Sequence, residues 1–177
     1  MDRYEQLRQI FNEKRCFKLV CGAGNEDVEE VRRLATIYTI AGTNVLDLSA
    51  NVDVVNAAKR GIEIAYEKAS LLGRDIKVRP YLNVSIGLKG DPHIRKAIID
   101  LKLCTECGEC IKACGEREAI KDDFIVIDSR CIGCGDCEKS CEFGAIDYYY
   151  NKADFEKILP ECVAAGTETM ELHAITL

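Results

Sequence analysis

The chain has 177 residues, of which 47% are hydrophobic, and carries a formal net charge of −6. Its size suits one ordinary domain with a small insert, and its acidity argues against a nucleic-acid partner, which would favour a basic stripe. No apolar run approaches the roughly 18 residues that span a bilayer and the N-terminal residues do not resemble a signal peptide, so we expect a cytoplasmic protein.

The first part of the chain alternates strand and helix patterns. Short apolar runs predict strands, and apolar residues at three- and four-residue steps predict helices. Asn25 and Asn51 are expected to cap the two helices, which Gly42 and Gly73 end. Strands joined by helices across short turns pair in parallel. The expected order is strand 17–21, helix 26–41, strand 44–48, helix 52–71 and strand 78–86.

The same pattern resumes near the C-terminus, with a helix at 152–165 that Gly166 ends and a strand at 169–175. We therefore predict a β/α part at 1–100, an insert at 101–150, and the remaining helix and strand at 151–177. The predicted fold is α/β, a partial (half) β/α-barrel-like parallel sheet with an inserted α+β ferredoxin-like module. Because an open parallel sheet leaves an edge and a face uncovered, we expect a truncated chain, a homo-oligomer or a second subunit.

The insert holds eight of the eleven cysteines, in two runs with the spacing C-x2-C-x2-C-x3-C. An odd total without a secretory signal argues against a disulfide framework, and structural zinc would favour two CxxC pairs across a longer gap. In runs of this spacing the fourth cysteine ligates the other 4Fe–4S cluster. The predicted ligands are Cys104, Cys107, Cys110 and Cys141 for one cluster, and Cys131, Cys134, Cys137 and Cys114 for the other.

The residues around the two runs also repeat. Ala119-Ile120 and Ala145-Ile146 follow the runs at matched positions, as in an internal duplication, and 124–127 is expected to form a strand between them. Glycines inside the runs allow backbone amides to approach the sulfur atoms, where such donors tune the metal. These glycines are Gly108, Gly133 and Gly135.

The stretch 101–150 resembles the bacterial ferredoxins with two 4Fe–4S clusters. That resemblance implies electron transfer, by default in a low-potential, anaerobic setting. One departure is that Gly115 and Glu142 stand where those ferredoxins usually have a proline after the fourth cysteine. Without proline the backbone keeps an amide donor near each cluster.

Four further motifs lie outside the two cysteine runs. They are Cys21-Gly-Ala-Gly-Asn25, Ala41-Gly-Thr-Asn44, Asp47-Leu-Ser-Ala-Asn51 and Asp91-Pro-His-Ile-Arg-Lys-Ala97. With these motifs, most of the chain resembles the LdpA-like iron–sulfur proteins, known from light- and redox-input to the cyanobacterial circadian clock. Members of that family look longer than this chain, and the resemblance implies a redox-sensing role.

The predicted strands carry polar residues on one face. Strand side chains alternate between faces, and strands covered on both faces should be apolar on both. The face could hold a substrate near the strand ends, a satisfied network of Lys18 with Asp47 or Glu171, or an exposed surface. A flavin or phosphate could also bind at the Gly22–Asn25 turn. The catalytic candidates are Cys21, Asp47, Glu171 and His173.

Three functions follow from these observations. The first is an electron-transfer protein or subunit that relays electrons through two 4Fe–4S clusters. The second is a redox sensor, and the third a subunit of a redox enzyme with a substrate or flavin site on the β/α part. Residues 101–150 hold eleven acidic and six basic side chains, so we expect a redox partner protein with a basic docking patch.

Overall fold

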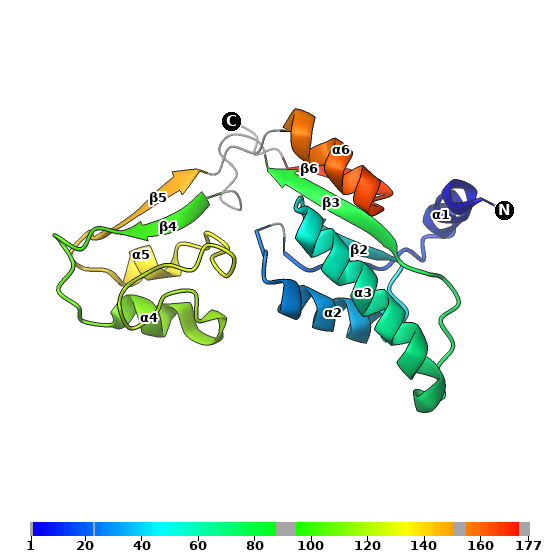
Figure 1. Cartoon of the computed structure of the whole chain (residues 1–177), viewed down its shortest axis with the longest axis horizontal. Helices are drawn as coiled ribbons and strands as arrows, with labels where there is room; N and C mark the ends of the chain where they lie inside the picture. Colours follow the sequence, from blue (N-terminus) through cyan, green and yellow to red (C-terminus); the bar gives the residue numbers. More distant parts are fainter. Residues whose placement is uncertain (1, 23, 88–94, 151–154, 174–177) are drawn as a thin grey trace.

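A computed structural model describes residues 2–22, 24–87, 95–150 and 155–173 (Figure 1). It contains a parallel sheet of four strands and a separate antiparallel pair. The four-stranded sheet has the order β1-β2-β3-β6, and the predicted parallel pairing with helical crossovers is confirmed. Its strands are β1 (Lys18–Val20), β2 (Val45–Ser49), β3 (Tyr81–Gly87) and β6 (Thr169–His173).

One face of this sheet packs against helices α2 (Val28–Ala41), α3 (Val52–Ala69) and α6 (Phe155–Ala165). Alternate residues of β2 and β3 point into that core, as the period of a strand requires. The short 3-10 turn η1 (Ser70–Leu72) extends α3 to Gly73. The fully buried strand residues of the core are Leu46, Leu48, Leu82 and Val84.

The helix caps agree with the sequence at α3 and differ at α2. Asn51 caps α3 as expected, and Gly42 ends α2 in the left-handed conformation. The expected cap Asn25 is wrong for α2, because Asp27 accepts hydrogen bonds from the first-turn amides of that helix. Asn25 instead accepts from the Asp27 amide at 3.0 Å, so it shapes the turn before the cap.

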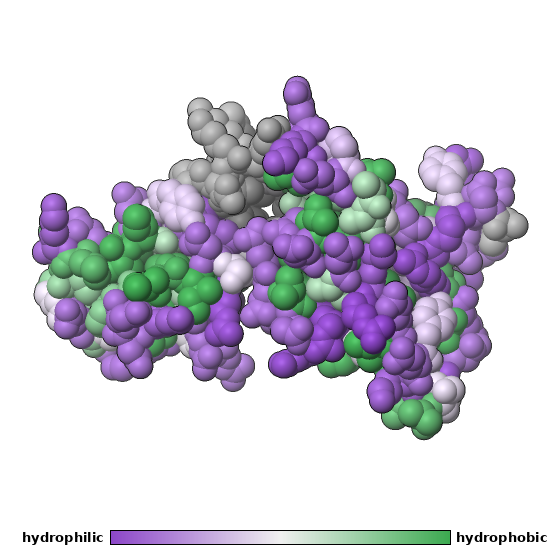
Figure 2. Space-filling model, viewed as in Figure 1, coloured by the Kyte–Doolittle hydropathy of each residue, from purple (hydrophilic) through white to green (hydrophobic). Residues whose placement is uncertain are grey.

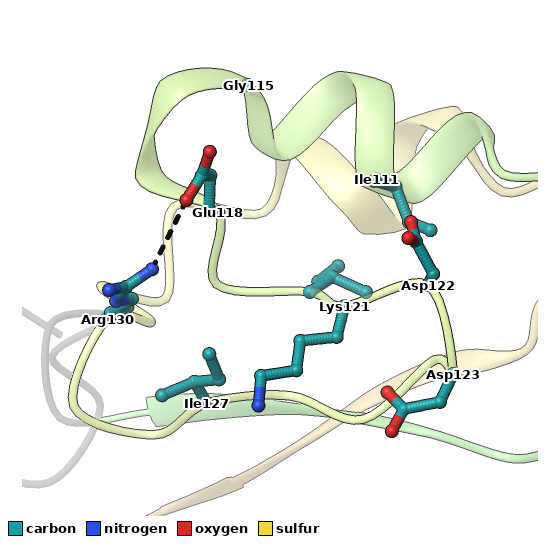
Figure 3. Close-up of a pocket in the computed structure, with 9 residues that line it drawn as sticks. Ile111, Gly115, Glu118, Lys121, Asp122, Asp123, Ile127 and Arg130 are labelled. Carbon is teal, nitrogen blue, oxygen red and sulfur yellow. Dashed lines mark hydrogen bonds and ion pairs between the residues drawn. The ribbon is translucent and has the colours of Figure 1, made fainter.

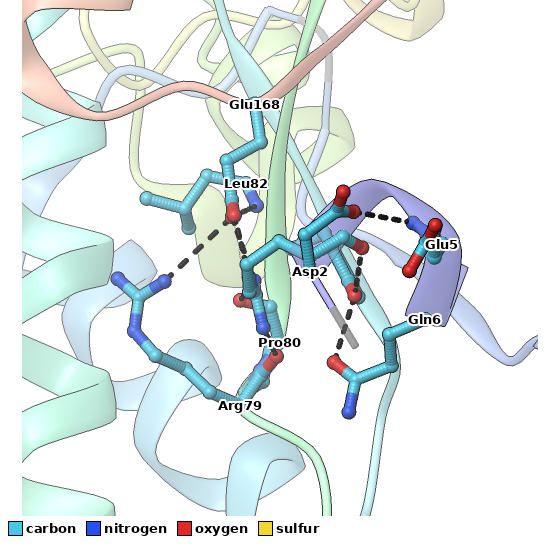
Figure 4. A network of polar contacts seen from close by, with 9 residues as sticks. Asp2, Glu5, Gln6, Arg79, Pro80, Leu82 and Glu168 are labelled. Atoms are coloured by element: carbon cyan, nitrogen blue, oxygen red, sulfur yellow. Dashed lines mark hydrogen bonds and ion pairs between the residues drawn. The ribbon is translucent and has the colours of Figure 1, made fainter. Parts of the chain in front are cut away.

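A helix at the N-terminus, α1 (Arg3–Asn12), is an element that the sequence analysis did not assign. Its buried side chains Leu7 and Ile10 pack against Val45 and Tyr81, at the starts of β2 and β3. A polar network joins the same region to the loop before β6 (Figure 4). In it the Glu168 carboxylate accepts from the Arg3 guanidinium at 2.7 and 2.8 Å and from the Leu82 amide at 3.3 Å.

The cysteine-rich part forms its own small core beside the sheet. Strands β4 (Arg95–Ile99) and β5 (Ile146–Tyr150) pair antiparallel, so this part includes a strand that lies ahead of residue 101. We call residues 95–150 the cysteine module. Its helices are α4 (Glu109–Cys114), the 3-10 turn η3 (Gly115–Arg117) and α5 (Asp136–Ser140).

The strand expected at 124–127 is wrong. Only a single bridge joins Ile120 to Val126, and Phe124 has a φ of 61°, which interrupts an extended backbone. The matched residues of the internal repeat lie in equivalent surroundings, since Ala119, Ile120, Ala145 and Ile146 are all buried. Over the described ranges, no helix combines the length and apolarity that crossing a membrane would take.

Candidate functional site

Two hollows in the cysteine module are each lined by four cysteines. The Cys104 site contains the first three cysteines of the first run and the last of the second, namely Cys104, Cys107, Cys110 and Cys141. The Cys131 site contains the complementary set, namely Cys131, Cys134, Cys137 and Cys114. The fold therefore brings the cysteines together in the two crossed groups that the spacing predicts.

Equivalent turns build the two sites. Gly108 precedes α4 and Gly135 precedes α5, with left-handed φ values of 76° and 89°. These values favour glycine because a Cβ would crowd the backbone. Each turn directs the third cysteine of its run into the first helical turn, and the fourth follows at the helix end. The two helices lie side by side, so each fourth cysteine reaches the other site (Figure 1).

Backbone amides point at sulfur atoms in both sites. The amides of Glu106 and Ala145 donate to the Sγ atoms of Cys104 and Cys141 at 3.4 Å, and the Ala97 amide donates to Cys131 Sγ at the same distance. Such donors stabilise thiolate sulfur, the form of cysteine that binds metal.

Burial raises the pKa of the Cys110 and Cys137 thiols above their ordinary value. Both thiols are therefore protonated near neutral pH in the metal-free protein. Because the thiolate is the ligand, metal binding must release these protons.

Positively charged side chains surround the Cys131 site. Lys96 is buried, and its ammonium donates to the carbonyl oxygens of Cys131 at 2.8 Å and Gly24 at 3.0 Å. Arg95 donates to the Gly133 carbonyl at 2.9 Å, and Arg117 donates to Cys134 Sγ at 3.7 Å.

The donor sets suit an iron–sulfur cluster. A 4Fe–4S cluster is held by four cysteine thiolates, and each site has four cysteines around a hollow that can supply them once their protons are released. No group of three or more His, Cys, Asp or Glu side chains within the described ranges is arranged to hold a single metal ion. When bound, such a cluster accepts and releases single electrons.

A third hollow in the module contains no cysteine (Figure 3). Its lining mixes charges and apolar groups, with Glu118 paired to Arg130 at 3.4 Å across the rim and Ile127 on its floor. This hollow therefore offers no cysteine ligand to a cluster.

The polar strand face forms a bonded network. Asp47 is buried, accepts hydrogen bonds from Asn83 at 2.7 Å and Ser85 at 2.5 Å, and pairs with Lys18 at 2.8 Å. Lys18 also pairs with Glu171. Of the three alternatives for this face, the charge network is present, and it joins Lys18 to both Asp47 and Glu171. His173 pairs with Gly87 in the strand register, and its side chain lies outside the described part.

Cys21 lies in the wall of a hollow of about 740 Å³ between the β/α part and the module, together with Cys114 and Arg117. Burial, with the Asp47 and Glu30 carboxylates nearby, raises the pKa of the Cys21 thiol to about 12. A thiol that stays protonated is a weak nucleophile. The surroundings of Cys21 therefore do not activate it as a catalytic nucleophile.

The sequence analysis missed the residues that join the module to the sheet. Lys96 lies 3.5 Å from Glu26, whose amide donates to the Ser129 carbonyl at 3.0 Å, and Arg130 pairs with Asp27 at 3.4 Å. One sequence feature could have revealed these contacts, namely that Lys96 stands in the apolar stretch of β4. Lysine is rarely buried without partners, so a lysine in such a strand indicates polar partners elsewhere in the chain.

Comparisons with known proteins agree with the cysteine chemistry. A family model described as a 4Fe-4S binding domain matches residues 124–146, which include the second cysteine run. The chain is 37% identical over 158 residues to "Light dependent period A" of Synechococcus elongatus. That alignment covers 89% of this chain and 43% of the relative, so the chain spans less than half of the relative's length. No solved structure matches significantly. The chain is an iron–sulfur protein that contains a ferredoxin-type 4Fe–4S binding domain.

Proposed function

We propose that this chain is an electron-transfer protein or subunit that holds two 4Fe–4S clusters, one at the Cys104 site and one at the Cys131 site. The observation that carries the proposal is the crossed grouping, in which each hollow draws three cysteines from one run and its fourth from the other. Because the two sites share one small core, electrons have a short path between them.

Anaerobic purification with iron and sulfide analysis, followed by EPR of the dithionite-reduced protein, tests this proposal. Two clusters require about eight iron and eight sulfide per chain, all held by cysteine. Coupled S = 1/2 signals would support a relay between neighbouring clusters. Zinc in place of iron, or about four iron per chain, would contradict the two-cluster proposal.

A redox sensor is the second candidate, and one structural feature favours it. The Cys131 loop bonds directly to the turn between β1 and α2, through Lys96 and through the Glu26 amide. Loss of a cluster would free this loop and release the turn. Similarity to a protein named for a light-dependent period also supports it. Mild oxidation distinguishes the two, because a relay keeps its clusters and a sensor loses them.

A subunit of a redox enzyme is the third reading, with a substrate or flavin bound on the polar strand face. The hydrogen bonds within the network around Asp47 favour a structural role for that face instead. Nothing in the described residues or the comparisons supports a flavin. Asp47→Ala with unchanged iron content and electron transfer would support the structural role.

We infer that a redox partner docks at the end of the module that holds Cys107. Cys107 is exposed, and exposed apolar side chains lie close to it in sequence or line the same site, among them Leu101, Leu103 and Phe143. Hydrophobic side chains gather over the module in Figure 2. Acidic residues follow each cysteine run, so a basic partner fits. Its reduction should slow as salt rises, and a flat salt response would contradict acidic docking.

We also infer that the sheet is half of a β/α barrel, completed by a second copy or another subunit. Its strands follow chain order, and the helices α2, α3 and α6 pack on one face, as in a barrel wall. On the end strand β6, Met170 and Leu172 are 47% and 58% exposed. Light scattering of the anaerobic protein measures whether two copies associate, and a monomer at all concentrations would leave only another subunit.

A further inference from the structure

Cationic side chains contact the second cysteine run directly. Arg117 donates to Cys134 Sγ, Arg95 to the Gly133 carbonyl, and Lys96 to the Cys131 carbonyl. Two of these donor distances are under 3.0 Å, and Lys96 is held in a buried position where water screens its charge little.

The Cys104 site has a different lining. Its non-cysteine residues are mainly apolar, and Glu109 is its charged member. Within the described residues, no lysine or arginine donates to a sulfur atom or to the backbone of the 104–110 run or of Cys141. Lys112, the cation of α4, is exposed and pairs with Glu109 at 2.6 Å.

Carboxylates offset part of the positive charge around the Cys131 site. Glu26 pairs with Lys96, Asp27 and Glu118 pair with Arg130, and Asp136 lies beside Cys134. Three cationic groups nevertheless donate to atoms of the run itself. Glu26, Asp27 and Glu118 pair with Lys96 and Arg130 instead, and Asp136 is the carboxylate that contacts a sulfur atom of the run. The asymmetry between the two sites therefore remains.

We propose that Arg95, Lys96 and Arg117 give the Cys131 site the higher reduction potential of the two, so that electrons move from the Cys104 site to the Cys131 site. The inference rests on the proposed two-cluster function. Potentials of these clusters depend on net charge and on hydrogen bonds to sulfur, and nearby cations stabilise the extra electron. The transfer oxidises the first site by one electron and reduces the second by one, with no proton moved and no bond broken.

This direction leads toward the β/α part. The Cys131 site bonds to that part through Lys96 and the Ser129 carbonyl, and its ligand Cys114 also lines the hollow that contains Cys21. The chain after β4, which leads into the first run, lies at the end of the module remote from the four-stranded sheet (Figure 1). A one-electron donor that docks at the Cys107 end, as proposed above, thus meets the Cys104 site first.

An anaerobic potentiometric titration followed by EPR tests the order of the two potentials. The variants are Arg117→Gln, which removes a charge at the Cys131 site, and Arg117→Lys, which keeps it. Lys121→Gln makes the same charge change on a side chain that lines neither site. We expect Arg117→Gln to lower the higher of the two potentials, by roughly a tenfold change in the ratio of reduced to oxidised cluster, or about 59 mV.

The lower potential should stay in place, Arg117→Lys should resemble the wild type, and Lys121→Gln should shift neither potential. If Arg117→Gln moved the lower potential, both equally, or neither, the proposed direction would be wrong while the two-cluster relay stood. A wild-type protein with a single cluster would instead contradict the proposed function itself. Because Arg117 is exposed, unfolding does not confuse these outcomes.

Discussion

The buried ammonium of Lys96, on β4, donates to the carbonyl oxygen of Cys131 at 2.8 Å. The same group bonds to Gly24 in the turn after β1, so one side chain couples a ligand loop to the β/α part. The substitution Lys96→Met keeps a side chain of similar length and removes its positive charge and its hydrogen-bond donors. Two carbonyl groups then lose a partner in a buried place, which costs about 1–3 kcal/mol for each unsatisfied group.

We expect Lys96→Met to increase backbone hydrogen exchange both around Gly24 and in the 129–134 loop, and mass spectrometry measures this. The control is Lys139→Met, on an exposed side chain of the same module, which should change neither segment. Faster exchange in only one of the two segments would show that Lys96 does not couple them.

Gly135 and Gly108 form a matched pair for substitution by alanine. Each has a left-handed φ, so alanine costs about 1–2 kcal/mol at either position. A Cβ on Gly135 would lie 3.0 Å from Nη2 of Arg95, whereas a Cβ on Gly108 would meet nothing within 4 Å. Gly135→Ala should therefore displace Arg95 as well as strain the turn.

Anaerobic thermal unfolding should show a similar loss of stability in both variants. Only Gly135→Ala should also lower the potential of a cluster, because Arg95 donates to the Gly133 carbonyl and stacks on Tyr148 with its Cζ 3.9 Å from the ring centroid. Equal shifts of potential in the two variants would indicate that the turn alone, and not Arg95, sets that potential.

The crossed grouping predicts which pairs of cysteine substitutions affect the same site and which affect both sites. Cys114→Ser combined with Cys131→Ser removes two ligands from the same site, so the double variant should keep about four iron per chain. Cys114→Ser combined with Cys104→Ser damages both sites and should keep almost none. Iron analysis and EPR of the two double variants measure the difference, and the reverse pattern would mean that each run holds its own cluster.

The spacing of the cysteines was enough to predict which four would meet in each hollow, because ligand geometry dictates short, regular intervals along the chain. Parallel strands and helices were equally predictable from periodicity. Asn25 was a misleading cap because Asp27, two residues later, has the same capping chemistry, and only tertiary contacts such as that of Asp27 with Arg130 decide between them.

Other features depend on contacts between distant parts of the chain. Helix α1 packs Leu7 and Ile10 against Val45 and Tyr81, but its remaining positions are mostly polar, so the local pattern is weak. The partners of Lys96 lie in two segments, each more than 30 residues away along the chain, and no local sequence pattern predicts these contacts.

The network around Asp47 predicts a structural rather than a catalytic role. Asp47→Ala removes the acceptor of Asn83 and Ser85 and leaves Lys18 with Glu171. Since Asp47 is buried, we expect a loss of about 2–4 kcal/mol in the free energy of unfolding. Ser49→Ala on the same strand is the milder control. Unchanged iron content and electron-transfer rate in Asp47→Ala would agree with this role.

Cys21 should react slowly in the native protein, and its reactivity should depend on pH in a defined way. Burial and two nearby carboxylates raise its pKa to about 12, from an ordinary value of 9.0. The native thiol therefore stays protonated between these two values, where the unfolded chain has lost the proton. By linkage the Cys21 thiol costs no stability below about pH 9, and the free energy of unfolding falls as pH rises from there toward 12.

Iodoacetamide labelling of the cluster-loaded protein, with mass spectrometry, should modify Cys21 far more slowly at pH 8 than after unfolding. Cys16 is the internal comparison, because it is only partly buried, although burial raises its pKa as well. Rapid labelling of Cys21 ahead of Cys16 would show an activated thiol and restore Cys21 as a catalytic candidate.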